Sequence, residues 1–124
     1  MISENRQNPR FEDIGRVEAS DICSLPGVLD DISTSGFGAH FPIFVDIDMD
    51  DDYKITIRPT ALSDYAGRTF LLIGHPQWKI DGEGGSRIGF KLLRSPDTPK
   101  YNEYVDTLAQ KSLDFDAIME PISV

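Results

Sequence analysis

The chain has 124 residues, of which 40% are hydrophobic and 27% charged, and its formal net charge is −9. This composition is typical of one globular domain, and the acidic balance argues against broad binding to DNA or RNA, which needs a positive surface. No apolar run approaches the ~20 residues that cross a bilayer, so we expect no membrane insertion. The single cysteine, Cys23, and a start without an apolar leader predict a cytoplasmic protein.

The first part of the chain contains no pattern of a helix or a strand. Its stretch RQNPR, Arg6 to Arg10, has no hydrophobic periodicity and carries a proline, which disfavours a helix. We therefore expect residues 1–12 to form a flexible arm that carries both arginines. A barrel domain (residues 13–95) and a C-terminal helix and tail (residues 96–124) would follow.

In the predicted barrel domain, apolar residues recur in short runs that are typical of β-strands. The clearest run is residues 53–59, where apolar and polar residues alternate with the period of a half-buried strand. A glycine-rich turn at residues 81–86 predicts a hairpin. We expect an irregularity in its first arm at His75-Pro76, because proline is tolerated at bulges and edges. The predicted strands are residues 15–20, 27–33, 36–45, 53–59, 68–81 and 87–94.

After residue 96 the period changes to that of a helix. Apolar residues from Tyr101 to Leu108 fall at positions i, i+3, i+4 and i+7, and the spacing repeats as far as Met119. Thr98 is a suitable N-cap, because Pro99 would then take the first helical position. These elements predict a mainly β fold: a six-stranded antiparallel, split β-barrel with a C-terminal α-helix against its wall or mouth.

The run DIDMDDDY, Asp46 to Tyr53, concentrates carboxylates and raises the question of a calcium site. An EF-hand loop that began at Asp46 would need glycine at its sixth position and glutamate at its twelfth, where this sequence has Asp51 and Ile57. A start at Asp48 fails in the same way. We interpret the run as a solvated acidic loop between two strands and expect no bound metal.

The residue types that carry most enzyme chemistry are isolated from one another in the sequence. His40 and His75 have no partner at the spacing of a metal site, and Cys23 has no nearby histidine to activate it. Asp30 and Asp31 are adjacent on a predicted strand, so their side chains should point to opposite faces and could not work as a paired acid and base. We expect no enzyme, no catalytic residue and no cofactor.

The stretch DISTSG, Asp31 to Gly36, connects two predicted strands. Asp, Ser and Gly are favoured at such corners, because the side chains bond to the backbone and glycine tolerates unusual torsions. A purely structural turn therefore explains the stretch. The same residues also offer a carboxylate acceptor, a hydroxyl and a backbone that a flat ring can approach, which are the groups that would hold the Watson–Crick edge of a guanine.

Two motifs in this order resemble the signature of the PilZ domain, a bacterial receptor for cyclic di-GMP. They are Arg6-Gln-Asn-Pro-Arg10, matching R-x-x-x-R, and Asp31-Ile-Ser33-Thr-Ser-Gly36, matching [D/N]-x-S-x-x-G. The hairpin that contains Trp78 also resembles the closing strands of the family. The likeness covers roughly residues 6–94 and implies a six-stranded barrel, in agreement with the strand count reached from periodicity.

The resemblance implies a role for each residue of the second motif. Asp31 would accept hydrogen bonds from N1 and N2 of a guanine, Ser33 would bond nearby, and Gly36 would keep the turn open. Trp78 would form a wall of the pocket, although a position in the core or at the barrel mouth explains it equally well.

The resemblance also implies roles for the arm. Arg6 and Arg10 would fork onto a phosphate or a guanine edge, or stack on a purine. Some relatives carry a further arginine before the first of these and tend to bind a stacked ligand dimer. Asn5 occupies that position here and favours a single ligand molecule, unless Arg16 or Arg87 supplies a third cation.

The function implied by the resemblance is that of a single-domain cyclic di-GMP receptor. Ligand binding would order the N-terminal arm, and the response would pass to a separate, unidentified partner protein in motility, adhesion or polysaccharide export. The alternative is a PilZ-like interaction module that binds only protein and no nucleotide.

Overall fold

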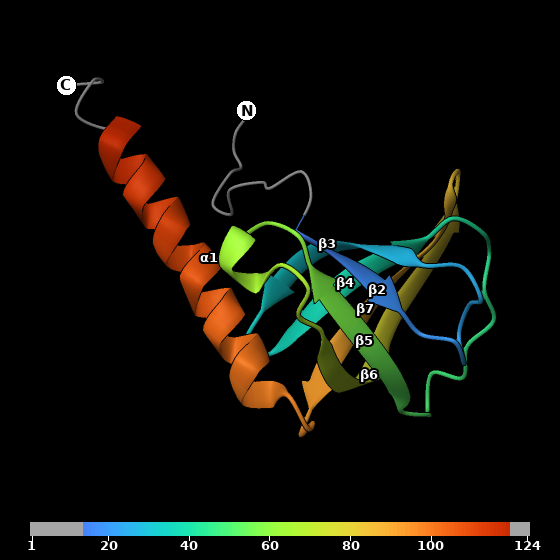
Figure 1. Cartoon of the computed structure of the whole chain (residues 1–124). Helices are drawn as coiled ribbons and strands as arrows, with labels where there is room; N and C mark the ends of the chain where they lie inside the picture. Colours follow the sequence, from blue (N-terminus) through green and yellow to red (C-terminus); the bar gives the residue numbers. More distant parts are fainter. Residues whose placement is uncertain (1–13, 120–124) are drawn as a thin grey trace.

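The computed structural model describes residues 14–119, with side chains to residue 111, and its strands close into an antiparallel barrel (Figure 1). The order around the barrel is β2-β3-β4-β7-β6-β5, and β2 closes the barrel by pairing with β5. The predicted fold, a mainly β six-stranded barrel with a C-terminal helix, is confirmed. The elements are β2 (Gly15–Glu18), β3 (Gly27–Ser33), β4 (Gly36–Phe41), β5 (Tyr53–Pro59), η1 (Ser63–Tyr65), β6 (Phe70–Gly82), β7 (Gly85–Leu93) and α1 (Thr98–Met119).

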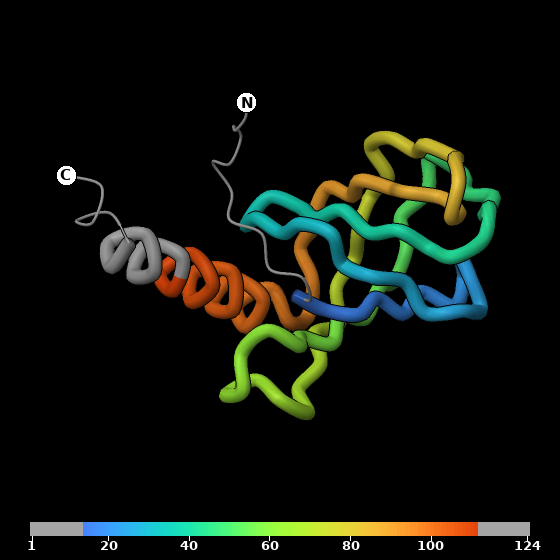
Figure 2. The backbone as a smooth tube through the Cα atoms, turned by 90° about the horizontal axis from the view of Figure 1, so that it is seen from above, coloured from blue at the N-terminus to red at the C-terminus, as the bar shows by residue number. Residues whose placement is uncertain are grey.

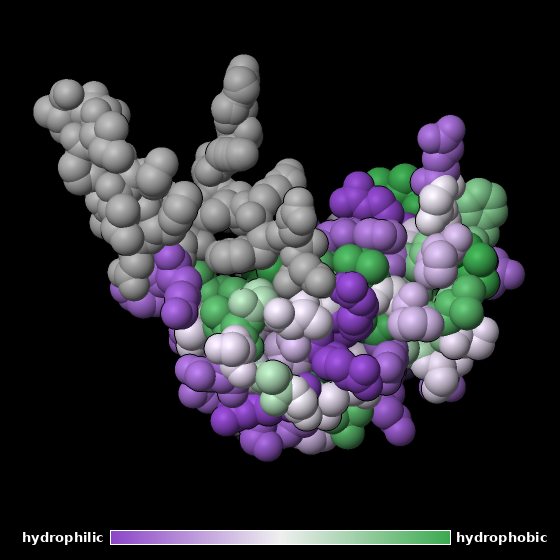
Figure 3. All heavy atoms as spheres, turned by 45° about the horizontal axis from the view of Figure 1, so that its top comes forward, coloured by the Kyte–Doolittle hydropathy of each residue, from purple (hydrophilic) through white to green (hydrophobic). Residues whose placement is uncertain are grey.

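The strands turn alternate side chains into the barrel. In β5, Ile55 and Ile57 are fully buried while Lys54 and Arg58 face solvent. Full burial of one such apolar side chain stabilises the fold by about 1.5–3 kcal/mol. The outer surface is correspondingly polar over most of the view in Figure 3, with smaller apolar areas between the polar ones. Other inward side chains are Val17, Leu29, Phe37, Ala39, Phe41, Phe70, Leu72, Ile88 and Phe90.

Helix α1 packs against the barrel through aromatic rings. The predicted apolar face is confirmed, since Tyr101, Tyr104, Val105 and Leu108 are all buried. Tyr104 packs edge-on against Tyr65 of η1 with ring centroids 4.9 Å apart, and both Figure 1 and Figure 2 show η1 beside α1. No helix in the described part of the chain is both long and apolar enough to span a bilayer.

Strand β4 is shorter than the sequence predicts. It ends at Phe41 because Pro42 has no N–H to continue the ladder. The chain then turns across the end of the barrel, where the N–H of Val45 donates to Ser86 Oγ at 3.0 Å. Residues 42–45 thus form a loop in which Val45 is buried while Ile43 and Phe44 are exposed, and not an extension of the strand.

The expected irregularity in β6 is confirmed, and the start of α1 differs by one residue. The register of β6 against β7 shifts between Pro76 and Trp78. Thr98 is the first helical residue instead of the cap, and Asp97 precedes it, with its carbonyl accepting the N–H of Tyr101 at 2.9 Å.

Candidate ligand-binding site

The turn between β3 and β4 is held together by the hydroxyl of Ser33. Its Oγ accepts from the N–H of Ser35 (3.3 Å) and donates to the carbonyl of Gly36 (3.2 Å). Such bonds from a side chain to its neighbouring backbone stabilise a tight connection without any ligand. The predicted strand-to-strand corner is confirmed, and its hydroxyl lies at the exposed surface.

Gly36 is needed because strand β7 approaches it closely. A Cβ at this position would collide with the carbonyl oxygen of Phe90. The φ angle of Gly36 is not positive, whereas Gly67, Gly84 and Gly85 have positive values. The requirement for glycine therefore comes from packing between β4 and β7, and not from the torsional freedom that the sequence suggested.

A bulge in β3 brings Asp30 and Asp31 to the same face of the barrel. The register of β3 against β4 shifts between Leu29 and Asp31. Asp30 Oδ1 lies 2.7 Å from His40 Nδ1, while the carboxylate of Asp31 covers the Cα of Gly38. Gly38 and His40 are two residues apart in one strand and so share a face. The prediction that Asp30 and Asp31 point to opposite faces is wrong. It assumed a regular strand, whereas the bulge inserts one extra residue and so turns both side chains to the same face.

Four residues on adjacent strands face one another across the outer wall of the barrel. Asp31 pairs with Gly38, Gly38 with Gly89, and Gly89 with Trp78. The indole of Trp78 lies directly over Gly89, where a Cβ would collide with it, and the side chain remains 42% exposed. We call these four residues the glycine shelf. The two glycines are buried beneath the carboxylate of Asp31 and the indole of Trp78, and these two groups form the outer surface of the shelf.

Helix α1 holds the β3–β4 turn through Tyr101. The buried hydroxyl donates to the carbonyls of Ser33 (2.6 Å) and Gly36 (3.0 Å), which are the two ends of the turn. Burial raises the pKa of Tyr101 above its ordinary value and outweighs the lowering effect of the bond to Ser33, while the charge of Asp31 raises it further. The phenol therefore stays protonated and remains a donor to the turn.

Tyr104, one helical turn along the same face of α1, holds the start of the barrel. Its hydroxyl donates to the carbonyl of Ile14 at 2.6 Å and accepts from the N–H of Ala61 at 3.2 Å. Ile14 is the first described residue and follows the predicted arm in the sequence. One helix thus contacts both the second motif and the first described residue of the chain.

The predicted site residues divide into a described and an undescribed group. Asp31, Ser33 and Gly36 lie together at the end of β3 and the start of β4, as their spacing requires. Trp78 lies on the outer wall of the barrel in the same row as Asp31, and not in the core or at the barrel mouth. Arg6 and Arg10, with the rest of the predicted arm, lie outside the described residues.

Sequence reasoning missed three residues that shape this site. Gly38 and Gly89 carry no motif, although glycine inside an otherwise regular strand is a known sign of close approach by another group. Tyr101 was predicted only as a core residue of the helix. Its contact with the turn spans 68 positions of sequence to Ser33, so no local pattern could indicate it.

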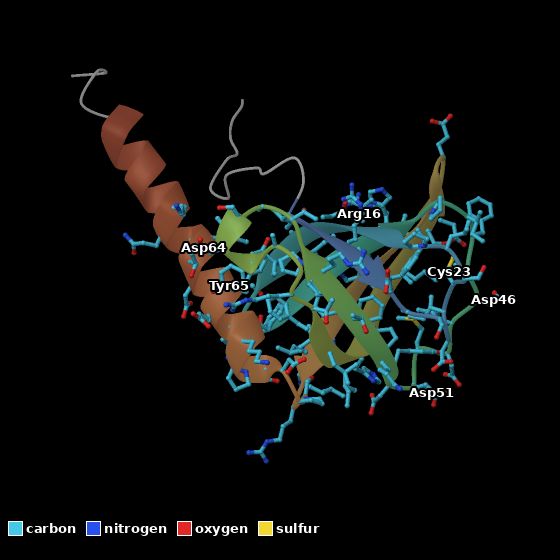
Figure 4. All side chains as sticks on the ribbon, in the orientation of Figure 1. Arg16, Cys23, Asp46, Asp51, Asp64 and Tyr65 are labelled. Atoms are coloured by element: carbon cyan, nitrogen blue, oxygen red, sulfur yellow. The ribbon has the colours of Figure 1, made fainter. Side chains whose placement is uncertain are left out.

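The histidines and the acidic loop form separate interactions. His75 Nδ1 lies 2.8 Å from Asp52 Oδ1, a pairing that the sequence spacing did not suggest. The acidic run forms the predicted loop between β4 and β5, and Asp46 and Asp51 lie on it in Figure 4, at the end of the barrel away from α1. Among the described residues, no group of three or more His, Cys, Asp or Glu side chains is placed to hold a metal ion.

Comparison with known proteins supports the fold and not a specific activity. No protein family model matches the chain, and no curated protein matches it. The structure is similar to that of the Bacillus subtilis inhibitor of motility, MotI/DgrA, with a TM-score of 0.63 and 13% sequence identity. The match covers 91% of this chain and 53% of that one, so this chain spans about half the length of its neighbour. The shared architecture supports the PilZ-like fold that the two motifs imply.

Proposed function

We propose that this protein is a receptor for cyclic di-GMP that acts as an adaptor and catalyses no reaction. The observation that carries the proposal is the glycine shelf, in which Asp31 and Trp78 stand in one row on an open face. The DISTSG turn, which supplied half of the resemblance to cyclic di-GMP receptors, lies directly beside that row.

The chemistry of the shelf fits one guanine of the ligand. A guanine edge presents the N1 and N2 hydrogens side by side, and the exposed carboxylate of Asp31 offers two acceptors that can receive them together. Gly38 and Gly89 carry no side chains, so the carboxylate of Asp31 and the indole of Trp78 can lie close against the wall and form its outer surface there. The exposed indole of Trp78 adds an aromatic surface against which a base can pack.

The arm supplies the complementary groups in this proposal. Arg6 and Arg10 bind the phosphates and the outer guanine edge, and Pro9 restricts the chain just before Arg10. Ordering an arm costs roughly 1–2 kcal/mol per residue in backbone entropy, which ligand contacts must exceed. Closure then acts as a switch that creates a new surface for a partner protein. The Bacillus subtilis inhibitor of motility shares the fold, so motility is the pathway in which we would first seek that partner.

Calorimetric titration with cyclic di-GMP tests the proposal. We expect the wild-type chain to bind and Arg10→Ala to lose about 1–3 kcal/mol, roughly tenfold to over a hundredfold in affinity. Asp31→Asn should lose a similar amount, because an amide cannot accept both guanine hydrogens. Asp51→Asn removes the same charge from the acidic loop and serves as the matched control. Absence of binding by the wild-type chain would refute the receptor and favour the module that binds only protein.

Amide chemical shifts would locate the switch. Cyclic di-GMP should shift residues 5–11 and residues 30–37 together if the arm closes on the turn. Shifts confined to residues 30–37 would contradict closure of the arm. The nucleotide recovered after long incubation should be unchanged, since we assign the protein no catalysis.

A further inference from the structure

A basic row of side chains runs beside the glycine shelf, although the chain as a whole has a net charge of −9. Arg16 of β2 pairs with Val28 of β3, Val28 with His40 of β4, and His40 with Arg87 of β7. We call Arg16, His40 and Arg87 the basic row. They are widely separated in the sequence, and only the register of the barrel brings them into line.

The basic row faces outward. The strand neighbours Val17, Ala39 and Ile88 are 0–1% exposed and lie inside the barrel, so the residues beside them point the other way. Figure 4 shows Arg16 on the outside of the barrel wall. The row therefore lies on the same outer face of the barrel as the shelf.

Asp30 organises two members of the row. Its carboxylate lies 2.7 Å from His40 Nδ1 and 3.6 Å from Arg87 Nε. The side chain of Asp30 is 22% exposed, against 39% for His40 and 58% for Arg87, so the carboxylate lies behind the groups that it holds. Because Arg87 meets Asp30 through Nε, the two Nη groups of its guanidinium remain available to an incoming anion.

The basic row and the glycine shelf are spaced as the two ends of a nucleotide require. His40 lies two residues from Gly38 on β4, and Arg87 lies two residues from Gly89 on β7, so the rows are about 7 Å apart. A base on the shelf would place its sugar-linked phosphate at the row. We propose that Arg16, His40 and Arg87 form a phosphate subsite on the barrel wall, which binds a phosphodiester of the cyclic dinucleotide independently of the arm arginines. This inference rests on the proposed receptor function.

Titration of the full chain with cyclic di-GMP at low and high salt tests the subsite. Arg87→Gln should weaken binding about tenfold at low salt, as expected for loss of a charge-assisted contact to phosphate. The difference from wild type should shrink at high salt, because screening already weakens an exposed ionic contact there. Arg87→Lys keeps the charge but not the fork of donors, and should recover part of the affinity.

Arg58→Gln is the matched control. Like Arg87, Arg58 is more than half exposed (53%) and contacts a carboxylate, that of Glu18 at 3.3 Å. It pairs with Arg16 in the same register row, but it lies on the side of Arg16 away from the shelf. Its substitution should change affinity less than about twofold. Equal losses for the Arg58 and Arg87 variants, or a difference that does not depend on salt, would overturn the subsite and leave the receptor intact. No binding by the wild-type chain would overturn both.

Discussion

Two aspartate-rich stretches of this barrel differ in almost everything except composition. Asp30 and Asp31 lie within β3, where a bulge turns them to one face and each covers or contacts a residue of β4. Residues 46–52 form a largely exposed loop with bonds inside it, such as that from the N–H of Asp50 to Asp48 Oδ1 at 2.9 Å, and exposed contacts at its end to Tyr53 and His75. Carboxylates become parts of a site only where neighbouring strands fix their direction.

A tyrosine hydroxyl contacts the turn that follows Asp31, and another contacts the acidic loop, so the contrast between the two regions can be measured. Tyr101 is fully buried and donates to both ends of the β3–β4 turn. Tyr53 accepts the N–H of Asp48 at 2.8 Å in an exposed contact at the edge of the acidic loop. Water can replace the second contact and not the first, so the two regions should respond very differently to equivalent substitutions.

The largest effect is expected at Gly36. Gly36→Ala should lower the free energy of unfolding by about 3 kcal/mol or more, because the added methyl meets the backbone oxygen of Phe90, which cannot move without disturbing the β4–β7 ladder. Chemical denaturation measures this loss. Gly82→Ala is the control, since nothing lies within 4 Å of its Cβ position, and it should leave stability unchanged or raise it by up to ~1 kcal/mol. Similar losses in both variants would contradict the close approach at Gly36.

Removal of the two hydroxyls compares the turn and the loop directly. Tyr101→Phe should cost about 1–3 kcal/mol of unfolding free energy, because the part-buried bonds to the carbonyls of Ser33 and Gly36 are lost and Gly36 keeps only the exposed bond from Ser33 Oγ among its side-chain donors. Tyr53→Phe should cost less than ~1 kcal/mol, since solvent reaches its partner. Amide exchange at residues 33–36 should rise in the first variant only. A turn that stays equally protected in Tyr101→Phe would show that α1 does not hold it.

Alkaline titration isolates the buried phenol. The pKa of Tyr101 is raised in the folded protein, so as the pH passes about 10 the phenol ionises in the unfolded chain while it stays neutral in the fold. Ionisation then stabilises the unfolded state alone, and the free energy of unfolding falls as the pH rises. Stability of the wild type should fall more steeply than that of Tyr101→Phe, by up to about 1.4 kcal/mol per pH unit. Parallel curves for the two proteins above pH 10 would contradict the assignment.

The smallest effect is expected in the acidic loop. Asp50→Asn should change the free energy of unfolding by no more than ~0.5 kcal/mol, because the side chain is exposed and the bond to Asp48 is made by the backbone N–H of Asp50, which the substitution keeps. Thermal unfolding at matched ionic strength measures it. A loss comparable to that of Tyr101→Phe would mean that the loop is a structural element in its own right.

Much of the fold follows from local patterns, and the failures have identifiable causes. Alternation in residues 53–59 and helical spacing from Tyr101 to Leu108 correctly predict β5 and the buried face of α1. The bulge at Asp30 was not predicted, because a bulge is defined against the partner strand and leaves no periodic trace of its own. The end of β4 was overestimated because an apolar loop resembles a strand in composition.

By itself, the sequence determined the strand content, the amphipathic helix and the grouping of Asp31, Ser33 and Gly36 at one turn, because each depends on residues that are close in the chain. Only the tertiary structure decided that Trp78 joins Asp31 in one row, that Tyr101 holds the turn, and that three dispersed basic residues align beside them. The physical reason is the register of a closed barrel. Its hydrogen-bond ladders fix which distant residues face each other, and that choice is made by the packing of the whole chain.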